Sequence, residues 1–388
     1  MSEPIAIVGA ARTPMGGFQG ELSGTTAPAL GAVAIGAALE RAGMPTDQVD
    51  EVLMGCVLPA GLGQAPARQA AFGAGLPKEV PCTTVNKMCG SGMKTVMMAM
   101  DALRAGEGRV VVAGGMESMT NAPYVVPKMR DGARLGHAQM MDHMFLDGLE
   151  DAYDEGKLMG AFAEDAAEAF QFTREAQDTY ALASLDNALE ASDRMTDEIA
   201  PVTIRTRKGA VEITADEQPK NARPEKIPTL KPAFREGGTV TPANSSSISD
   251  GAAALVLMRA GDAKGPVRAR ILAHASHAQE PGKFVTAPIP AMQKVLAKVG
   301  WSVEDVDLWE INEAFAVVPM AAMREMNIPR DKLNVNGGAC ALGHPIGASG
   351  ARIIVTLLHE MERRDAKRGI ASLCIGGGEG TAVAIERD

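Results

Sequence analysis

Aromatic residues and cysteines are scarce in this chain of 388 residues. With aromatics at 4%, small residues and 23 methionines must supply much of the packing, because methionine fills irregular gaps. The five cysteines are an odd number and too few for a disulfide scaffold. Their sparseness favours a reducing compartment, so we expect a cytoplasmic protein.

Basic residues are outnumbered by acidic ones, 38 against 48, which gives a net charge of −10. They form no basic stripe, which argues against nucleic acid or an anionic membrane as the main partner. Metal motifs are also missing: the chain has no CxxC pair and no HExxH. His274 and His277 lie three apart in an expected strand and point to opposite faces, so we expect no metal site.

Long hydrophobic runs and a leader sequence are lacking as well. Met1-Ser2-Glu3-Pro4 leads directly into an apolar strand, so we expect no signal peptide. The uncharged stretch around residues 22–39 consists mainly of small residues and contains Pro28, which does not favour a membrane span.

Apolar strands alternate with helical patterns in the first part of the chain. We expect strands at 5–8, 49–55, 81–85 and 110–113, with helices at 29–43, 67–74 and 93–104. Strands that are almost wholly apolar indicate an α/β protein with a core sheet of the parallel type.

The second part of the chain repeats this plan. Leu39, Gly43, Val49 and Asp50 match Leu296, Gly300, Val306 and Asp307 at one constant spacing. Later matches show that the second copy carries about eight extra residues in one turn, including His344. We therefore expect two βα halves about a pseudo-twofold axis, with one turn from each half meeting at a site.

The segment between the copies is different in character. It has a long irregular stretch, helical patterns near 161–172 and 174–192, and an exposed charged run at 214–236. It either contacts the substrate or only sets oligomer contacts. The expected division is 1–118 plus 241–266 for the first half, 119–240 for the insertion and 267–388 for the second half.

Cys89 stands where an expected strand turns into a helix, between Met88 and Gly90. Free backbone N–H groups at a helix start favour an anion, so this position predicts a lowered thiol pKa and a nucleophilic sulfur. The alternative is a small buried core cysteine.

Two further turns carry reactive side chains. His344 lies in a tight Gly343-His344-Pro345 loop and can exchange protons, unless it is a core histidine bonded to the backbone. Cys374 precedes three glycines whose bare N–H groups could hold an oxyanion. A buried cysteine is the alternative there, and a phosphate-gripping loop is disfavoured because no P-loop lysine follows.

These motifs together resemble the thiolase family, the acyl-CoA acyltransferases that make or cleave 3-ketoacyl-CoA. The resemblance covers essentially the whole chain and rests on five motifs in order: Val85-Asn86-Lys87-Met88-Cys89-Gly90-Ser91-Gly92, Gly114-Gly115-Met116-Glu117-Ser118-Met119, Asn312-Glu313-Ala314-Phe315, Gly343-His344-Pro345-Ile346-Gly347-Ala348-Ser349-Gly350 and Cys374-Ile375-Gly376-Gly377-Gly378. It implies the thiolase fold, with duplicated βα halves forming a five-layered αβαβα core and an inserted loop domain.

The resemblance also implies a mechanism. Cys89 takes the acetyl group from one acetyl-CoA, and His344 activates Cys89 and protonates the leaving CoA. Cys374 deprotonates the second acetyl-CoA. The enolate oxygen is held by His344 and by a water on Asn312, and the next oxyanion rests on the N–H groups of Cys89 and Gly376. No permanently bound cofactor is implied, because coenzyme A and acetyl-CoA are substrates.

Coenzyme A contacts carried over from the family fall on Met159, Ser246, Ala314 and Phe315, with Lys220 or Arg223 meeting the adenine or phosphates. Leu158 stands where a histidine is common, and Ser245 and Ser247 replace residues that are usually Ala or Gly. Glu379 stands where Gln or Met is usual, and the sequence offers no reason for it.

The resemblance favours an acetyl-CoA C-acetyltransferase that forms acetoacetyl-CoA. The alternatives are a degradative thiolase for longer or dicarboxylic 3-ketoacyl-CoA and an inactive acyl-CoA binding protein. A homotetramer built as a dimer of dimers is implied. The chain-length preference and the physiological direction stay open.

Overall fold

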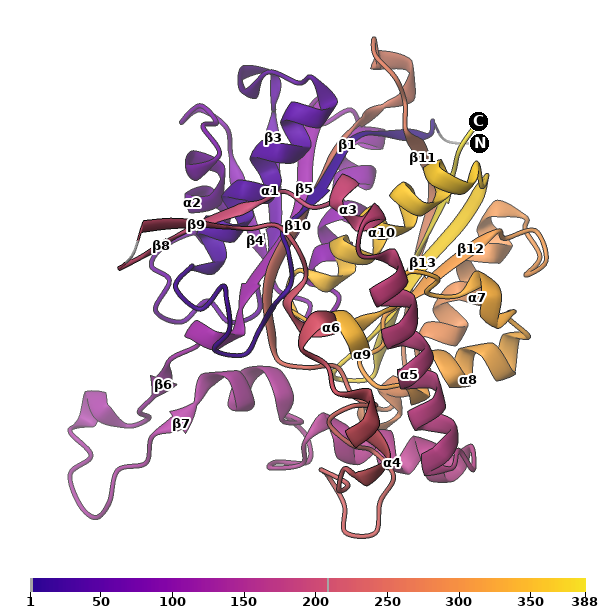
Figure 1. Ribbon diagram of the computed structural model, residues 1–388. Coiled ribbons are helices and arrows are strands. Elements are labelled where there is room, and N and C mark those ends of the chain that lie inside the picture. The colour runs from indigo at the N-terminus through magenta and orange to yellow at the C-terminus, as the bar shows by residue number, and fades with distance from the viewer. Residues whose placement is uncertain (1–2, 208) are drawn as a thin grey trace.

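The computed structural model describes residues 3–207 and 209–388 (Figure 1). Its described residues form one ten-stranded sheet in the order β12-β13-β14-β11-β1-β10-β5-β3-β4, with β2 paired to β10. The strands of the first half are β1 (Ile5–Arg12), β2 (Gly16–Gly17), β3 (Glu51–Gly55), β4 (Cys82–Val85), β5 (Val110–Ser118) and β10 (Ser249–Arg259). Those of the second half are β11 (Ala269–Ala278), β12 (Leu308–Ile311), β13 (Arg368–Ile375) and β14 (Glu379–Glu386).

The sheet is mixed, which corrects the expected parallel type. Only β3–β4, β3–β5 and β12–β13 run parallel, and the remaining pairs of the sheet are antiparallel. The three glycines 376–378 between β13 and β14 are too short for a crossover and can join only antiparallel strands. The strand sequences are nevertheless almost wholly apolar, because helices cover both faces of the sheet.

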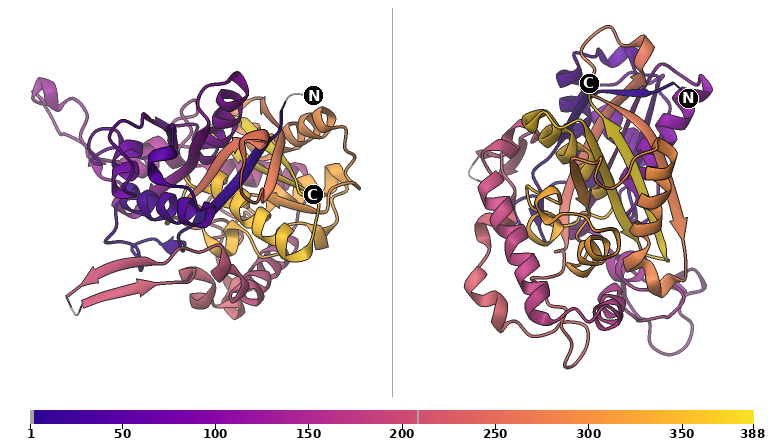
Figure 2. Two further views of the ribbon diagram at one scale, coloured as in Figure 1. Left: turned by 90° about the horizontal axis from the view of Figure 1, so that it is seen from above. Right: turned by 90° about the vertical axis from the view of Figure 1, so that its right-hand side faces the viewer.

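Helices and the two sheet halves stack in five layers. The helices of the two halves are α1 (Ala27–Ala42), α2 (Pro66–Gly73), α3 (Ser91–Ala105), α7 (Pro288–Val299), α8 (Val317–Met326), α9 (Ala339–Leu342) and α10 (Ser349–Arg364). α1 and α2 cover the outer face of the first half, while α7 and α8 cover that of the second. α3 and α10 pack against each other between the halves. Figure 2 shows the indigo first half and the orange and yellow second half on opposite sides.

The predicted duplication is visible in the order of elements. β1, α1, β3, α3, β5 and β10 correspond to β11, α7, β12, α10, β13 and β14. In the first half, β4 pairs with β3. At the equivalent position beside β12, the second half has a single parallel bridge between Trp309 and Leu333 in place of a strand. The two halves join where β1 and β11 pair through Ile5–Ile7 and 269–271. This architecture confirms the predicted duplication of βα halves.

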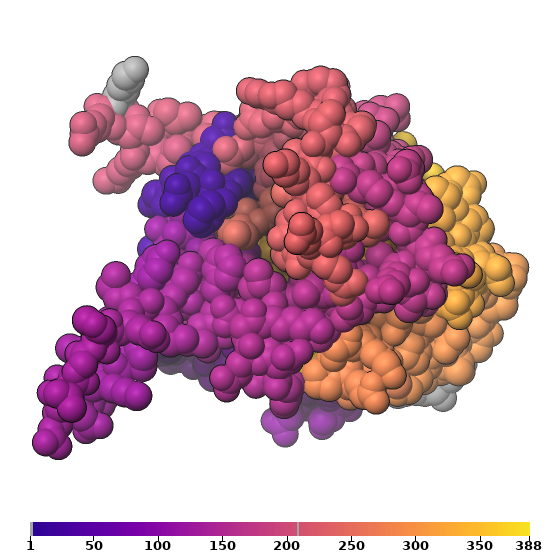
Figure 3. Space-filling model, turned by 90° about the horizontal axis from the view of Figure 1, so that it is seen from below, coloured from indigo at the N-terminus to yellow at the C-terminus, as the bar shows by residue number. Residues whose placement is uncertain are grey.

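The segment from 119 to 248 lies over one end of the core. Its elements are β6 (Tyr124–Val125), β7 (Met141–Asp142), the short π-helix η4 (Phe145–Leu149), α4 (Met159–Ala169), α5 (Arg174–Ala191), β8 (Val202–Thr206), β9 (Gly209–Ile213) and α6 (Glu217–Asn221). The connections of the whole core and of this segment contain short 3₁₀ segments: η1 (Thr46–Gln48), η2 (Met119–Asn121), η3 (Met129–Asp131), η5 (Arg194–Asp197), η6 (Pro224–Thr229), η7 (Ala260–Asp262), η8 (Pro281–Thr286) and η9 (Arg330–Lys332). An arm around β6 and β7 stands away from the body in Figures 1 and 3.

No helix among residues 3–207 and 209–388 is long and apolar enough to cross a membrane. Over the same residues, no cluster of three or more His, Cys, Asp or Glu side chains could hold a metal ion.

Candidate active site

Cys89 lies in the turn between β4 and α3, as predicted. Met88 has a φ of 48°, and Gly90 caps the helix. A Cβ on Gly90 would come within 2.4 Å of the Cδ1 atom of Ile375, so a larger residue would require that side chain to shift, and glycine lets this turn pack closely against the turn that follows β13. The nucleophile candidate and the Cys374 turn are therefore in direct contact.

The expected lowered pKa of Cys89 is wrong for the free protein. Cys89 is half-buried by exposed area, but its thiol is surrounded by protein, and burial raises its pKa to about 11. The backbone N–H groups of Gly376 and Cys89 act in the opposite direction without compensating for burial. Desolvation of the thiolate outweighs the helix start, so Cys89 rests as a neutral thiol.

His344 is held as a neutral base with one defined tautomer. Gly343 has a φ of 99°, and a Cβ there would lie 2.1 Å from the Oγ atom of Ser249. The Nδ1 atom of His344 lies 2.6 Å from the Oγ atom of Ser349, whose hydroxyl donates to the carbonyl of Pro345 at 3.0 Å. Ser349 must then accept from the Nδ1–H group, which leaves the lone pair on Nε2.

The Nε2 atom of His344 is buried and has no hydrogen-bond partner among the described residues. Burial lowers the pKa of His344 to about 3, and the charge of Arg352 acts in the same direction. The imidazole is therefore neutral near pH 7 and free to accept a proton.

Cys374 is fully buried near the end of β13. Its pKa is raised well above the ordinary value by burial, and a charge on Cys89 would raise it further. Because each thiolate disfavours the other, the two thiols titrate as a coupled pair and do not ionise together.

One cavity of about 340 Å³ brings these groups together. Cys89, His344, Cys374 and Gly376 all line it. Most of the remaining lining is apolar: Phe145, Leu149, Phe234, Ile248, Phe284 and Ile346. An apolar cavity with a few convergent polar groups is the usual form of a small-molecule site.

Asn312 follows β12 and is buried, but it is not one of the residues that line this cavity. Both polar atoms of its side-chain amide lack a hydrogen-bond partner among the described residues. The next residue, Glu313, fixes the turn by accepting from Tyr180, Ser184, Asn334 and Cys340. A water bound to the free amide is the arrangement that would satisfy it.

Four of the predicted coenzyme A contacts line the same cavity: Met159, Ser246, Ala314 and Phe315. The unusual serines beside Ser246 have their own partners. Ser245 donates to the carbonyl of Thr241 at 2.7 Å, and the hydroxyl of Ser247 is hydrogen-bonded to Gln218. Leu158 adds apolar surface at the start of α4.

The two basic candidates lie elsewhere. Lys220 pairs with Glu21 at 3.3 Å at the surface, and Arg223 lines a neighbouring cleft of about 490 Å³. Pro242 lines both that cleft and the cavity, so the two are adjacent.

Sequence reasoning missed several residues that organise the site. Ser349, which sets the histidine tautomer, carried no signal beyond its place in the turn. Glu379 gains an explanation: its carboxylate pairs with Lys87 and links the Cys374 turn to the Cys89 turn. Glu117 accepts backbone hydrogen bonds from the loop after β3, at Val57 and Leu58, and from the His344 loop, at Gly347.

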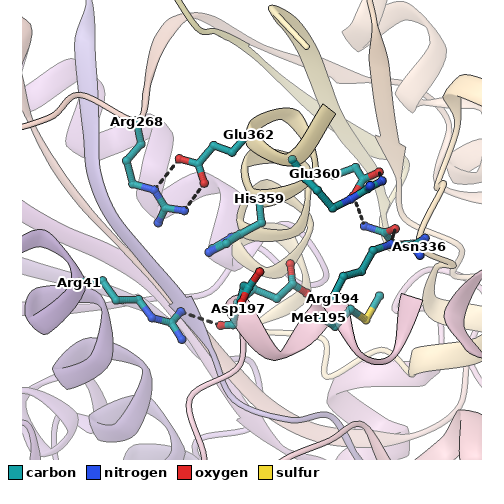
Figure 4. A pocket seen from close by; sticks show the side chains of 11 residues that line it. Arg41, Arg194, Met195, Asp197, Arg268, Asn336, His359, Glu360 and Glu362 are labelled. Atoms are coloured by element: carbon teal, nitrogen blue, oxygen red, sulfur yellow. Dashed lines mark hydrogen bonds and ion pairs between the residues drawn. The ribbon is translucent and has the colours of Figure 1, made fainter. Parts of the chain in front are cut away.

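A larger cleft of about 510 Å³ holds none of the predicted site residues (Figure 4). Its charges satisfy one another: Arg268 pairs with Glu362, and Arg363 with Glu360. Arg41 donates to the carbonyls of Ala10, Glu198 and Ile199.

The chain is thus an α/β protein of two duplicated halves, with two thiols and a neutral imidazole lining one apolar cavity. The family models for the thiolase N-terminal domain and the thiolase C-terminal domain match residues 5–261 and 265–387. The chain belongs to the thiolase family, which confirms the resemblance drawn from its motifs.

Named relatives are similar over full length. The acetyl-CoA acetyltransferases of Pseudomonas aeruginosa and Cupriavidus necator are each 51% identical to this chain, with 100% and 99% of both sequences covered. The crystal structure of the Bacillus anthracis acetyl-CoA acetyltransferase has a TM-score of 0.96 at 41% identity, over 99% of both chains. The Acat5 thiolase from Ascaris suum in complex with coenzyme A has a TM-score of 0.94 at 40% identity, over 100% of both chains.

Proposed function

We propose that this protein catalyses the reversible condensation of two acetyl-CoA molecules to acetoacetyl-CoA and coenzyme A, through an acetyl-Cys89 intermediate. The observation that carries this proposal is the meeting of Cys89, His344 and Cys374 in one cavity. The names of the full-length relatives support the same reaction.

In the first half-reaction, the Sγ atom of Cys89 attacks the thioester carbonyl while Nε2 of His344 takes the thiol proton. The N–H groups of Cys89 and Gly376 receive the oxyanion. The bond from carbon to the CoA sulfur then breaks, and His344 returns the proton to the departing thiolate. A neutral thiol beside a neutral imidazole is the resting state that this step needs.

Acetylation of Cys89 prepares the second half-reaction, because a thioester carries no charge. Burial is the main cause that raises the pKa of Cys374, and acetyl-Cys89 cannot add a negative charge that would raise it further. Cys374 first passes its thiol proton to Nε2 of His344, and the resulting Cys374 thiolate takes a methyl proton from the second acetyl-CoA. The enolate oxygen is held by His344 and by a water on Asn312.

The enolate carbon then attacks the acetyl-Cys89 carbonyl. A carbon–carbon bond forms, the bond to Cys89 breaks, and the proton held on Nε2 of His344 passes to the Cys89 thiolate, while Cys374 keeps the proton taken from the methyl group. Each step is supplied by side chains and backbone of this chain, so we propose that no resident cofactor takes part.

Coenzyme A would enter along Met159, Ser246, Ala314 and Phe315, which line the approach to the thiols. Arg223 in the adjacent cleft, or Lys220 after release from Glu21, would meet the adenine or phosphates. The predicted division into halves 1–118 plus 241–266 and 267–388, with the insertion 119–240, is part of this proposal, since the insertion supplies Met159.

We also propose a cytoplasmic homotetramer, built as a dimer of dimers. The free state of all five cysteines fits a reducing compartment. The arm around β6 and β7 carries apolar side chains in the open: Leu135 is 97% exposed and Met140 is 72% exposed. Such a patch on a projecting arm suits contacts between copies.

The test is a thiolysis series that compares acetoacetyl-CoA with 3-ketoacyl-CoA of eight or more carbons. We expect kcat/KM to be highest for acetoacetyl-CoA. A clear preference for the longer chain would replace the proposal by a degradative thiolase, and coenzyme A binding without any turnover would replace it by an acyl-CoA binding protein.

A further inference from the structure

Glu117 is a fully buried carboxylate at the end of β5 that no cation accompanies within the described residues. Its Oε2 atom accepts from the N–H groups of Val57 at 2.8 Å and Gly347 at 2.9 Å. Its Oε1 atom accepts from Leu58 at 3.1 Å and from the Cys56 thiol at 3.6 Å. Burying a carboxylate without a cation is costly, so these bonds must be important for the structure around them.

The contact with Gly347 joins the two halves, because Gly347 belongs to the loop that carries His344. Its carbonyl fits into a slot formed by glycines of the first half. A Cβ on Gly115, Gly55 or Gly92 would come within 2.0, 2.7 or 3.0 Å of that oxygen. The N–H group of Gly347 is fixed by Glu117 and its carbonyl side by the slot, so the residue has little freedom to move.

Fixing Gly347 also fixes His344. The N–H groups of Ala348 and Ser349 both bond to the carbonyl of Pro345, at 2.9 and 3.0 Å. The hydroxyl of Ser349 binds the imidazole at Nδ1. The segment from 344 to 349 is therefore one compact turn, and a shift at Gly347 moves the imidazole.

We propose that Glu117 is a positioning residue: by holding the N–H group of Gly347 from the opposite half, it sets the approach of His344 to the Cys89 thiol. This inference rests on the proposed function, because its effect is on acetyl transfer to Cys89. Glu117 touches neither substrate nor the reacting atoms and acts through the histidine turn.

Glu117→Gln is the direct test, since an amide keeps the shape but puts an N–H₂ donor opposite at least one of the three backbone N–H groups that now donate to the carboxylate. Misplacing a catalytic base by about 1 Å can cost about 100-fold in rate. We expect acetyl-Cys89 formation in a single turnover, and kcat for thiolysis, to fall by about 10- to 100-fold with KM within about twofold.

Asp307→Asn is the matched control. Asp307 likewise accepts two backbone N–H groups, from Lys367 and Arg368, but at the end of β13 that lies away from Cys374. It should lower the melting temperature while leaving both rates within about twofold. Equal rate losses in the two variants, or an unchanged acetylation rate in Glu117→Gln, would overturn the proposal.

A second readout separates positioning from general stability. Burial is the main cause that raises the pKa of Cys89, and the charge of Glu117 adds to it, so alkylation of Cys89 in Glu117→Gln should move to lower pH, and in Asp307→Asn it should not. Absence of this shift would contradict the placement of Glu117 behind the thiol.

Gly347→Ala tests the same contact from the other side, should Glu117→Gln fail to fold. The added Cβ would lie 2.6 Å from the Oε2 atom of Glu117 and push the turn away, with the same loss of acetylation expected. Wild-type rates in that variant would refute the proposal. Failure of the wild-type protein itself to form acetyl-Cys89 would instead refute the proposed function.

Discussion

The two turns that precede α3 and α10 are copies of one unit that now serve different purposes. In the first copy the chain passes from β4 to α3 within a few residues and places Cys89 beside the helix start. In the second copy the extra residues form α9 and the loop that carries His344 before α10 begins. The two halves therefore have the same order of elements, but the extra residues in the second turn place a histidine where the first turn places a cysteine.

Burial affects the two turns in a complementary way. It raises the pKa of the Cys89 thiol to about 11 and lowers the pKa of His344 to about 3. Both groups are therefore neutral in the resting state, and charge develops only when a proton passes from one turn to the other. The comparison predicts a division of labour between nucleophile and base that substitutions can separate.

The largest expected effect separates the two thiols. Cys89→Ala should abolish covalent labelling by acetyl-CoA, because no other thiol sits in the first turn. Cys374→Ala should keep labelling and lose condensation, because the base for the second step is gone. Intact-mass spectrometry after incubation with acetyl-CoA checks the first outcome and a coupled assay the second. Persistent acetylation of Cys89→Ala would remove Cys89 from the nucleophile role.

The second effect concerns pH. Because the pKa of Cys89 lies above the working range, its thiolate fraction should rise about tenfold per pH unit and alkylation by iodoacetamide about 100-fold from pH 7 to 9. His344 is already neutral there, so its titration adds no step in that window. Mass spectrometry of Cys89 over time gives the rate. A plateau below pH 8 would favour a lowered thiol pKa for Cys89, as the helix start alone suggested.

The third effect concerns the histidine tautomer. Ser349→Ala removes the acceptor for the Nδ1–H group of His344 and frees the ring to rotate. We expect kcat to fall about 10-fold with a smaller change in KM, as for other lost orienting bonds to a histidine. Thr95→Ala is the control, since it deletes a buried hydroxyl that bonds only to the carbonyls of Gly92 and Gly114. Equal losses of kcat in Ser349→Ala and Thr95→Ala would mean that Ser349 has only a structural role.

Much of this arrangement could be predicted from the sequence, and the failures have physical causes. Cys89 at a strand-to-helix turn follows from local patterns, and the repeat spacing of Leu39 and Leu296 reveals the duplication. The pKa of Cys89 could not be predicted, because desolvation depends on the Cys374 turn packed over it. The mixed sheet was missed because strands covered on both faces look alike in either direction. Glu117 and Ser349 act through contacts that exist only once the halves meet.

The smallest expected effect comes from the ion pair that links the two turns. Lys87 and Glu379 lie on the Cys89 turn and just beyond the Cys374 turn, and their side chains are 21% and 36% exposed. Partly exposed pairs contribute only about 0.2–1 kcal/mol, so Glu379→Gln should lower the melting temperature slightly and change kcat by no more than about twofold. Lys87→Met and the double variant complete a double-mutant cycle. A coupling energy within error of zero would mean that the packing of Gly90 on Ile375 alone holds the turns together.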